Sequence, residues 1–131
     1  MACRYANEFA DNEDKLKGVA LLVSYPSDDE SSIAFEGLKG LGLKVHSIWG
    51  TNDGLTTEDK IEETKSVLPD DTKFLSIVGG NHTQFYYTDK LQNDDNEADI
   101  SLNDQQIKIR EEMHKLLVEV SAEERAVPGS R

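Results

Sequence analysis

KVHSIWGTNDG, residues Lys44–Gly54, is the stretch that decides the fold. Its first seven residues carry the apolar members Val45, Ile48 and Trp49, which is typical of a strand. The turn that follows, Gly-Thr-Asn-Asp-Gly, is rich in residues that tolerate tight backbone conformations. The strand therefore ends by presenting one carboxylate, that of Asp53, at its carboxyl edge.

Two further stretches read as strands of the same sheet. Residues Gly18–Tyr25 (GVALLVSY) form a nearly continuous apolar run, which is typical of a strand covered on both faces. Pro26 ends that run. Residues Lys73–Val78 (KFLSIV) form the third strand, and Gly79-Gly-Asn-His82 follows it directly.

Helical patterns separate and follow these strands. A helix is expected over about 57–68, with Thr56 as N-cap, Asp59 as its capping-box partner and Pro69 as terminator. Ile61, Thr64 and Leu68 mark its inner face. A longer helix is expected from the cap Ser101 to about Glu123, with an apolar stripe on one face made of Ile109, Met113, Leu116 and Val120. Short helices over 2–10 and 33–41 complete the pattern.

Alternating strands and helices predict an α/β fold built on a parallel sheet with right-handed crossovers. About three strands with flanking helices make a partial doubly wound sheet, which leaves an exposed edge. We expect one partial domain over residues 1–123 and a disordered tail over 124–131. The polar stretch 83–100 is long for a structureless loop, and such loops are usually functional or mobile.

Composition excludes several kinds of partner. The 131 residues include 26 acidic and 14 basic side chains, for a formal net charge of −12, so binding to nucleic acid or to an anionic membrane would be repulsive. No apolar run is long enough to span a membrane. The one cysteine, Cys3, forbids an intramolecular disulfide and slightly favours a reducing compartment such as the cytoplasm.

Two candidate catalytic side chains follow neighbouring strands. Asp53 comes after the second strand and His82 after the third, so both should emerge at one edge of the sheet, within hydrogen-bonding reach. A carboxylate that accepts from imidazole Nδ1–H fixes the tautomer and leaves Nε2 as a base. The other two histidines, His46 and His114, lack this placement and are interpreted as structural or surface residues. No ligand spacing for a metal is recognisable, and no cofactor is implied.

Several motifs together resemble a small α/β-hydrolase, over roughly residues 2–120. The resemblance rests on the strand-end segments Ser24-Tyr-Pro26 and Ser47–Leu55, on Lys60-Ile61 and Leu68-Pro69, on Gly79-Gly-Asn-His82 with Gln84-Phe85, and on Gln92, Asp95, Asn96, Ala98, Ile100 and Ser101. It implies that the chain is the C-terminal half of that fold, with Asp53 as the acid and His82 as the base of a serine hydrolase.

The nucleophile that such a pair would serve is absent, because no G-x-S-x-G occurs in the 131 residues. Ser24, Ser47 and Ser76 lack a following glycine elbow, and nothing suggests a reactive Cys3. The resemblance implies that residues from Met1 onward form the helix after the missing elbow. We therefore expect the serine and the oxyanion loop to precede Met1 in a longer parent.

The sequence also departs from the family's pattern after the histidine. Tyr86-Tyr-Thr-Asp89 stands where the family tends to have a glycine-containing stretch, and Asp94 replaces an expected glycine. These changes bear on the conformation of the loop after His82 rather than on the identity of Asp53 and His82.

The favoured hypothesis is a hydrolase of ester or similar acyl bonds by ancestry, inactive alone. It would act on a small-molecule acyl substrate only when complemented by the missing half. The alternative is a non-catalytic truncated or self-associating module that forms a homo-oligomer through its sheet edge. A phosphate-accepting receiver domain is disfavoured, because Tyr25-Pro26 and Gly79-Gly-Asn81 do not supply its acidic pair and lysine.

Overall fold

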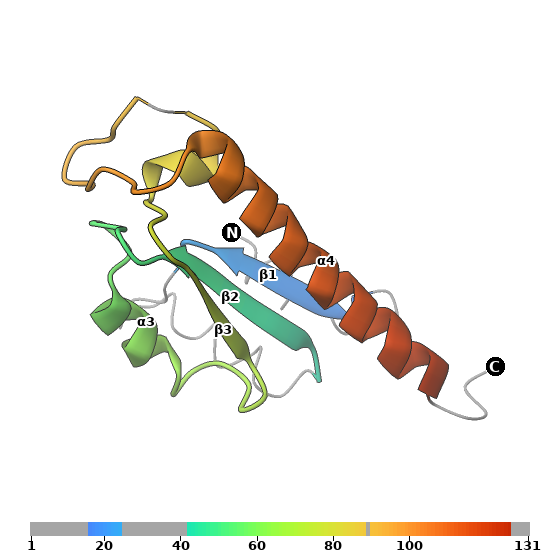
Figure 1. Ribbon diagram of the computed structural model, residues 1–131. Helices are drawn as coiled ribbons and strands as arrows, with labels where there is room; N and C mark the ends of the chain where they lie inside the picture. The colour runs from blue at the N-terminus through green and yellow to red at the C-terminus, as the bar shows by residue number, and fades with distance from the viewer. Residues whose placement is uncertain (1–15, 25–41, 89, 127–131) are drawn as a thin grey trace.

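A computed structural model describes residues 16–24, 42–88 and 90–126 of the chain (Figure 1). Its elements in chain order are the strands β1 (Gly18–Leu22) and β2 (Lys44–Gly50), the helix α3 (Glu58–Thr64), the strand β3 (Lys73–Ile77), the 3₁₀ helix η2 (Thr83–Tyr86) and the helix α4 (Leu102–Ala126). The three strands form one parallel sheet in the order β1-β2-β3. The prediction of a partial α/β fold with a parallel sheet is therefore confirmed.

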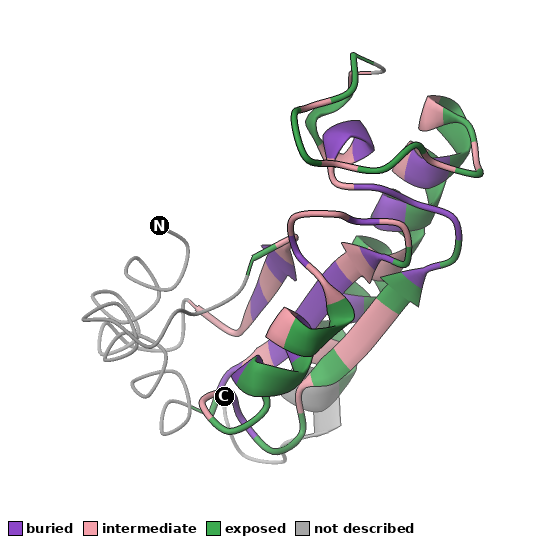
Figure 2. Cartoon of the chain, turned by 90° about the vertical axis from the view of Figure 1, so that its left-hand side faces the viewer, coloured by how far each residue is buried: buried purple, intermediate pink, exposed green. Residues whose placement is uncertain are grey.

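Apolar side chains cover both faces of this sheet. On one face Val19, Leu21 and Val45 pack with Leu68, which follows α3. On the other face Ile48 and Ile77 pack with Ile109 of α4. Figure 2 shows α3 in front of the sheet with α4 behind it, and the buried residues of the central strand lie between the two layers. The period-2 alternation of each strand thus divides its side chains between two half-cores.

The first strand and the first described helix are shorter than predicted. β1 ends at Leu22, because Val23 turns into the left-handed region with φ 45° and leaves the strand. α3 ends at Thr64, four residues before Leu68, although Ile61, Thr64 and Leu68 are buried as expected.

The predicted capping box of α3 is wrong. The N-cap is Thr57, without a side-chain cap bond. The hydroxyl of Thr56 donates instead to the carbonyl of Val23 at 3.0 Å, because the residue lies in the strand-end turn rather than at the helix start. The Thr56 hydroxyl, which the local sequence predicts as the helix cap, is thus used in a tertiary hydrogen bond instead.

Helix α4 crosses the sheet, and its start matches the prediction. The hydroxyl of Ser101 accepts a hydrogen bond from the backbone N–H of Asp104 at 3.0 Å, as an N-cap does. The expected stripe is wrong at Met113, whose side chain is exposed, whereas Ile109 and Leu116 are buried. The inner face contains the polar Gln105 and Glu112 instead. A search for apolar residues at helical spacing therefore does not find this face.

Some predictions fall on residues outside the described ranges. These are the helices expected at 2–10 and 33–41, the Tyr25-Pro26 end of the first strand, Cys3, and most of the expected tail at 124–131. Helix α4 itself continues to Ala126, three residues past the expected end. Within the described part of the chain, no helix combines the length and apolar character needed to cross a membrane.

Candidate active site

The carboxyl ends of β2 and β3 are held against each other by backbone contacts. The Asn52 N–H donates to the Gly80 carbonyl at 2.8 Å, and the Thr51 N–H donates to that of Ile77 at 3.0 Å. Gly50 has no side chain to obstruct this approach, and a Cβ there would overlap the carbonyl group of Gly80. The turn after β2 and the loop after β3 therefore meet at one edge of the sheet, as parallel strands require.

Asp53 lies buried in the first of these turns with a fixed orientation. Its Oδ1 accepts from the backbone N–H groups of Leu55 at 2.8 Å and of Thr56 at 2.6 Å. Its side chain has 0% exposure. Because Oδ1 is committed to the turn, Oδ2 is left to face the loop after β3.

His82 meets that oxygen. Its Nδ1 lies 3.0 Å from Asp53 Oδ2 and 3.4 Å from the hydroxyl of Thr56. The hydrogen of the Thr56 hydroxyl is directed to the Val23 carbonyl, so both groups near Nδ1 can only accept. The geometry therefore places the proton on Nδ1 and the lone pair of the neutral imidazole on Nε2.

Tyr86 is the aromatic neighbour of this histidine. The two ring centroids are 5.6 Å apart with a tilt of 48°. The phenol ring is largely exposed and stands at the end of η2, one turn after His82. The sequence signalled Tyr86 only as a departure in the loop after the histidine.

A network of buried amides holds the histidine loop onto α4. The side chain of Gln105, which is 0% exposed, accepts from the Asn81 N–H at 3.1 Å and donates to the Asn81 carbonyl at 2.7 Å. It also accepts from the Gln84 amide at 2.7 Å. Asn81 in turn accepts from the Gln84 N–H at 2.9 Å. Residues on both sides of His82 are thus fixed. The one sequence signal for this network is a polar residue, Gln105, at a position of α4 that faces the protein interior.

Asp95 joins the acid turn to the histidine loop from a third segment. Its Oδ1 accepts from the Gly54 N–H at 2.9 Å and, at 3.4 Å, from that of His82. Its Oδ2 accepts from the N–H of Thr83 at 2.8 Å and from its hydroxyl at 2.6 Å. Partial burial alone would raise the pKa of Asp95, but these hydrogen bonds outweigh it and hold the pKa below its usual 3.8.

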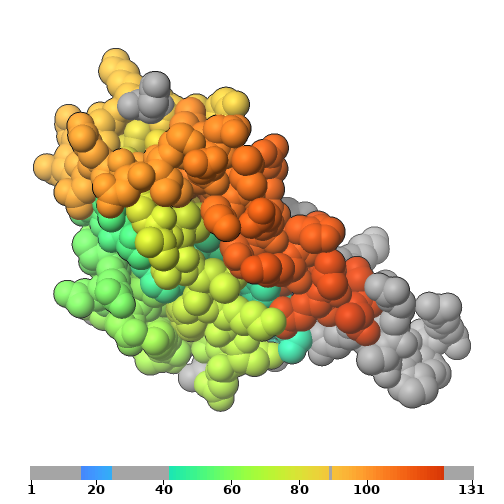
Figure 3. Space-filling model, in the orientation of Figure 1, coloured from blue at the N-terminus to red at the C-terminus, as the bar shows by residue number. Residues whose placement is uncertain are grey.

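The loop that carries Asp95 passes close to the acid turn (Figure 3). In that view the loop, gold to orange, covers one end of the molecule beside the green segment after β2. A Cβ on Gly54 would overlap the carbonyl of Asp94, so glycine is required there. Asp94 itself has φ 67°, a left-handed conformation that glycine adopts readily and aspartate tolerates. This explains how Asp94 stands where the resemblance led us to expect glycine.

The remaining histidines lie apart from this pair. His46 is buried in β2, and its Nε2 contacts Glu119 of α4 at 2.9 Å. Glu119 also accepts from Lys73 at 2.9 Å, and this hydrogen bond is the main reason why the pKa of Glu119 lies below its usual value. His114 is exposed on α4.

The described serines that were considered as nucleophiles give no alternative site. Ser47 is buried within β2, and Ser24 and Ser76 are exposed at or near strand ends. None of the three is followed by the glycine of a nucleophile elbow. Cys3 lies outside the described residues.

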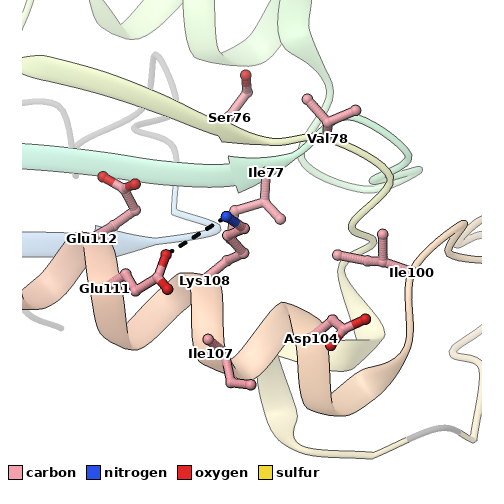
Figure 4. Close-up of a pocket in the computed structure, with 9 residues that line it drawn as sticks. All are labelled: Ser76, Ile77, Val78, Ile100, Asp104, Ile107, Lys108, Glu111 and Glu112. Atoms are coloured by element: carbon pink, nitrogen blue, oxygen red, sulfur yellow. Dashed lines mark ion pairs between the residues drawn. The ribbon is translucent and has the colours of Figure 1, made fainter.

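A hollow of about 530 Å³ lies between β3 and α4 (Figure 4). Apolar side chains of Ile77, Val78, Ile100 and Ile107 line it, beside the ion pair of Lys108 and Glu111. Neither Asp53 nor His82 reaches it. Within the described ranges, no group of three or more His, Cys, Asp or Glu side chains is arranged to hold a metal ion.

Comparison with known proteins identifies a family for this chain. Residues 1–107 match the alpha/beta hydrolase family. The chain belongs to the alpha/beta hydrolase family. In this alpha/beta hydrolase chain the match includes all three strands, Asp53, His82 and Asp95, and it ends within α4. No curated protein and no solved structure matches the chain.

Proposed function

We propose that this chain supplies the acid and the base of a serine hydrolase that acts on an ester or a similar acyl bond. Asp53 is the acid and His82 the base. The observation that carries the proposal is the contact between Asp53 Oδ2 and His82 Nδ1, in surroundings that allow only one imidazole tautomer. Family membership supports the reaction class.

The chemistry follows from the free nitrogen of the imidazole. With Nδ1–H donated to the carboxylate, Nε2 accepts the proton of a serine hydroxyl as that oxygen attacks an acyl carbon. The imidazolium that forms is stabilised by Asp53, which is buried and already oriented by Leu55 and Thr56. His82 then returns the proton to the leaving group.

The serine itself is not part of this sequence, which contains no G-x-S-x-G. An acyl-enzyme cannot form without a nucleophile, so we expect the chain to be inactive alone. In an assay with a p-nitrophenyl ester, the chain and its His82→Ala variant should give equal rates. A rate that depends on His82 in the isolated chain would contradict this part of the proposal.

Complementation tests the positive part. The reading frame upstream of the Met1 codon is joined to the chain, if it encodes a G-x-S-x-G segment, and ester hydrolysis is measured. Hydrolysis that is lost with His82→Ala and with Asp53→Ala supports the proposal, whereas the Lys65→Ala control on the surface should retain it. Full activity in the His82→Ala protein would overturn it.

The second candidate is a non-catalytic module that self-associates. Among the described residues, β1 and β3 each pair only with β2, and Met113 and Leu117 of α4 are exposed apolar side chains. Such surfaces favour association. Sedimentation of the isolated chain over a range of concentrations tests this, since a monomer throughout would remove the support for this candidate.

A further inference from the structure

Asp95 accepts four hydrogen bonds close to the predicted pair, yet its side chain bonds neither the Asp53 carboxylate nor the His82 ring. It accepts instead from the backbone of the residue after each of them and, at 3.4 Å, from the backbone N–H of His82 itself. Gly54 directly follows the acid, Thr83 directly follows the base, and both donate their backbone N–H to Asp95 at 2.9 and 2.8 Å. One side chain thus sets the distance between two separate turns.

We propose that Asp95 is a positioning residue that fixes the distance and the tautomer of the Asp53–His82 pair. The inference rests on the proposed function, because it assigns a role within that same pair. Its physical basis is the number and kind of donors. Asp95 receives three backbone N–H groups and one hydroxyl, and an ionised carboxylate can accept all four.

An amide of the same shape cannot replace this carboxylate. In Asp95→Asn, one orientation of the side chain turns its NH₂ toward the N–H of Thr83, and the other turns it toward the N–H of Gly54. Either way a donor faces a donor at the residue next to the base or the acid. The Thr83 hydroxyl oxygen already accepts from the Gln92 N–H at 3.0 Å. Even if it accepts a second bond from the amide, the backbone N–H of Thr83 still faces a donor.

The consequence reaches His82 through the backbone. The Nδ1–H form depends on Asp53 Oδ2 at 3.0 Å and on the Thr56 hydroxyl at 3.4 Å. A shift of either turn lengthens both contacts, and the competing Nε2–H form then becomes populated. Asp95 therefore acts through the spacing of the turns and not by contact with the imidazole.

The test is the ¹⁵N spectrum of the imidazole rings in the full chain at a pH where His82 is neutral, which reports the tautomer directly. In the wild type we expect His82 to be almost entirely Nδ1–H, and Asp53→Asn should abolish this preference. Asp95→Asn should convert it to a mixture in which the Nε2–H form is at least a third of the population. The matched control is Asp94→Asn, which removes the same charge from the neighbouring exposed position.

The outcomes separate the two proposals. A mixture in Asp95→Asn with an unchanged Asp94→Asn supports the positioning role. An unchanged tautomer in Asp95→Asn, or an equal effect of both variants, overturns it and leaves the Asp53–His82 pair intact. A wild type without the Nδ1–H preference overturns the proposed function and this inference together. If Asp95→Asn does not fold by circular dichroism, Thr83→Val decides, because it removes one of the four donors and should shift the tautomer in the same direction.

Discussion

Gly50, the last residue of β2, lies directly against the carbonyl of Gly80 in the loop after β3. This contact has no room for a Cβ. It allows the Asn52 N–H to reach the same carbonyl at 2.8 Å, so the two strand ends are joined through their main chains. The separation of Asp53 and His82 therefore depends first on a residue without a side chain.

Replacing this glycine should disturb both stability and the pair. Gly50→Ala forces the Gly80 backbone to move, and we expect it to lower the free energy of unfolding by about 1–3 kcal/mol, as overpacking does. Urea unfolding measures this loss. Gly42→Ala is the comparison, because its Cβ would meet open space although its φ of 67° makes it strained. Only Gly50→Ala should also change the ¹⁵N resonances of His82, and unchanged resonances would show that the strand ends tolerate the methyl group.

The buried amide of Gln105 gives a second prediction. Gln105→Leu leaves the N–H and the carbonyl of Asn81 without their present partners, which should cost about 1–3 kcal/mol. Arg110→Leu, on the exposed side of the same helix, should change stability by less than about 0.5 kcal/mol. Denaturant unfolding of both variants gives the comparison. Equal losses would mean that the amide network contributes nothing specific.

Acid should weaken the connection that Asp95 makes. Its pKa is lower in the folded chain than its usual 3.8, so the unfolded chain binds the proton first as the pH falls. The stabilisation is therefore complete above that value and is lost as the pH drops toward the folded pKa. Unfolding of the wild type and of Asp95→Asn between pH 7 and pH 3 measures this. Their difference in stability should shrink below about pH 4, and a constant difference would contradict the prediction.

The cluster around His46 gives a prediction at the opposite end of the sheet. Glu119→Ala removes the partner of the buried His46 Nε2 and of Lys73, and the unpaired imidazole should cost about 1–3 kcal/mol. Glu62→Ala breaks the exposed pair with Lys65 and should cost at most about 0.5 kcal/mol. Thermal unfolding can compare the two variants. A loss in Glu62→Ala as large as that in Glu119→Ala would refute the importance of burial here.

The sequence predicts the sheet well because each strand carries its own signal. Apolar runs give the strands, and the residues that follow β2 and β3 place Asp53 and His82 at one edge. Their catalytic roles remain predictions, supported by the tautomer that the geometry selects. This part of the site depends on short-range patterns plus one rule of topology.

The rest of the site could not be predicted, because it depends on contacts between distant segments. Asp95 lies 41 residues from Gly54 in the sequence. The sequence pointed to it only as one of the residues that resemble the family, without a role. Gln105 is buried because it forms hydrogen bonds with Asn81 and Gln84, whereas the apolar pattern placed Met113 on the inner face of the helix. Thr56 is of a residue type that often caps helices, but its hydroxyl donates to the Val23 carbonyl. In each case a tertiary partner overrides the local preference.

The backbone character of the contacts around the pair has a consequence for how this site can change over time. Gly54, Leu55, Thr56 and Thr83 all present main-chain N–H groups to the two carboxylates. A main-chain donor survives most substitutions of its own residue other than proline, although Gly54 is itself fixed because a Cβ there would overlap the Asp94 carbonyl. The side chain at a half-buried position such as Leu55 can therefore change, while the contact between Asp53 and His82 is retained.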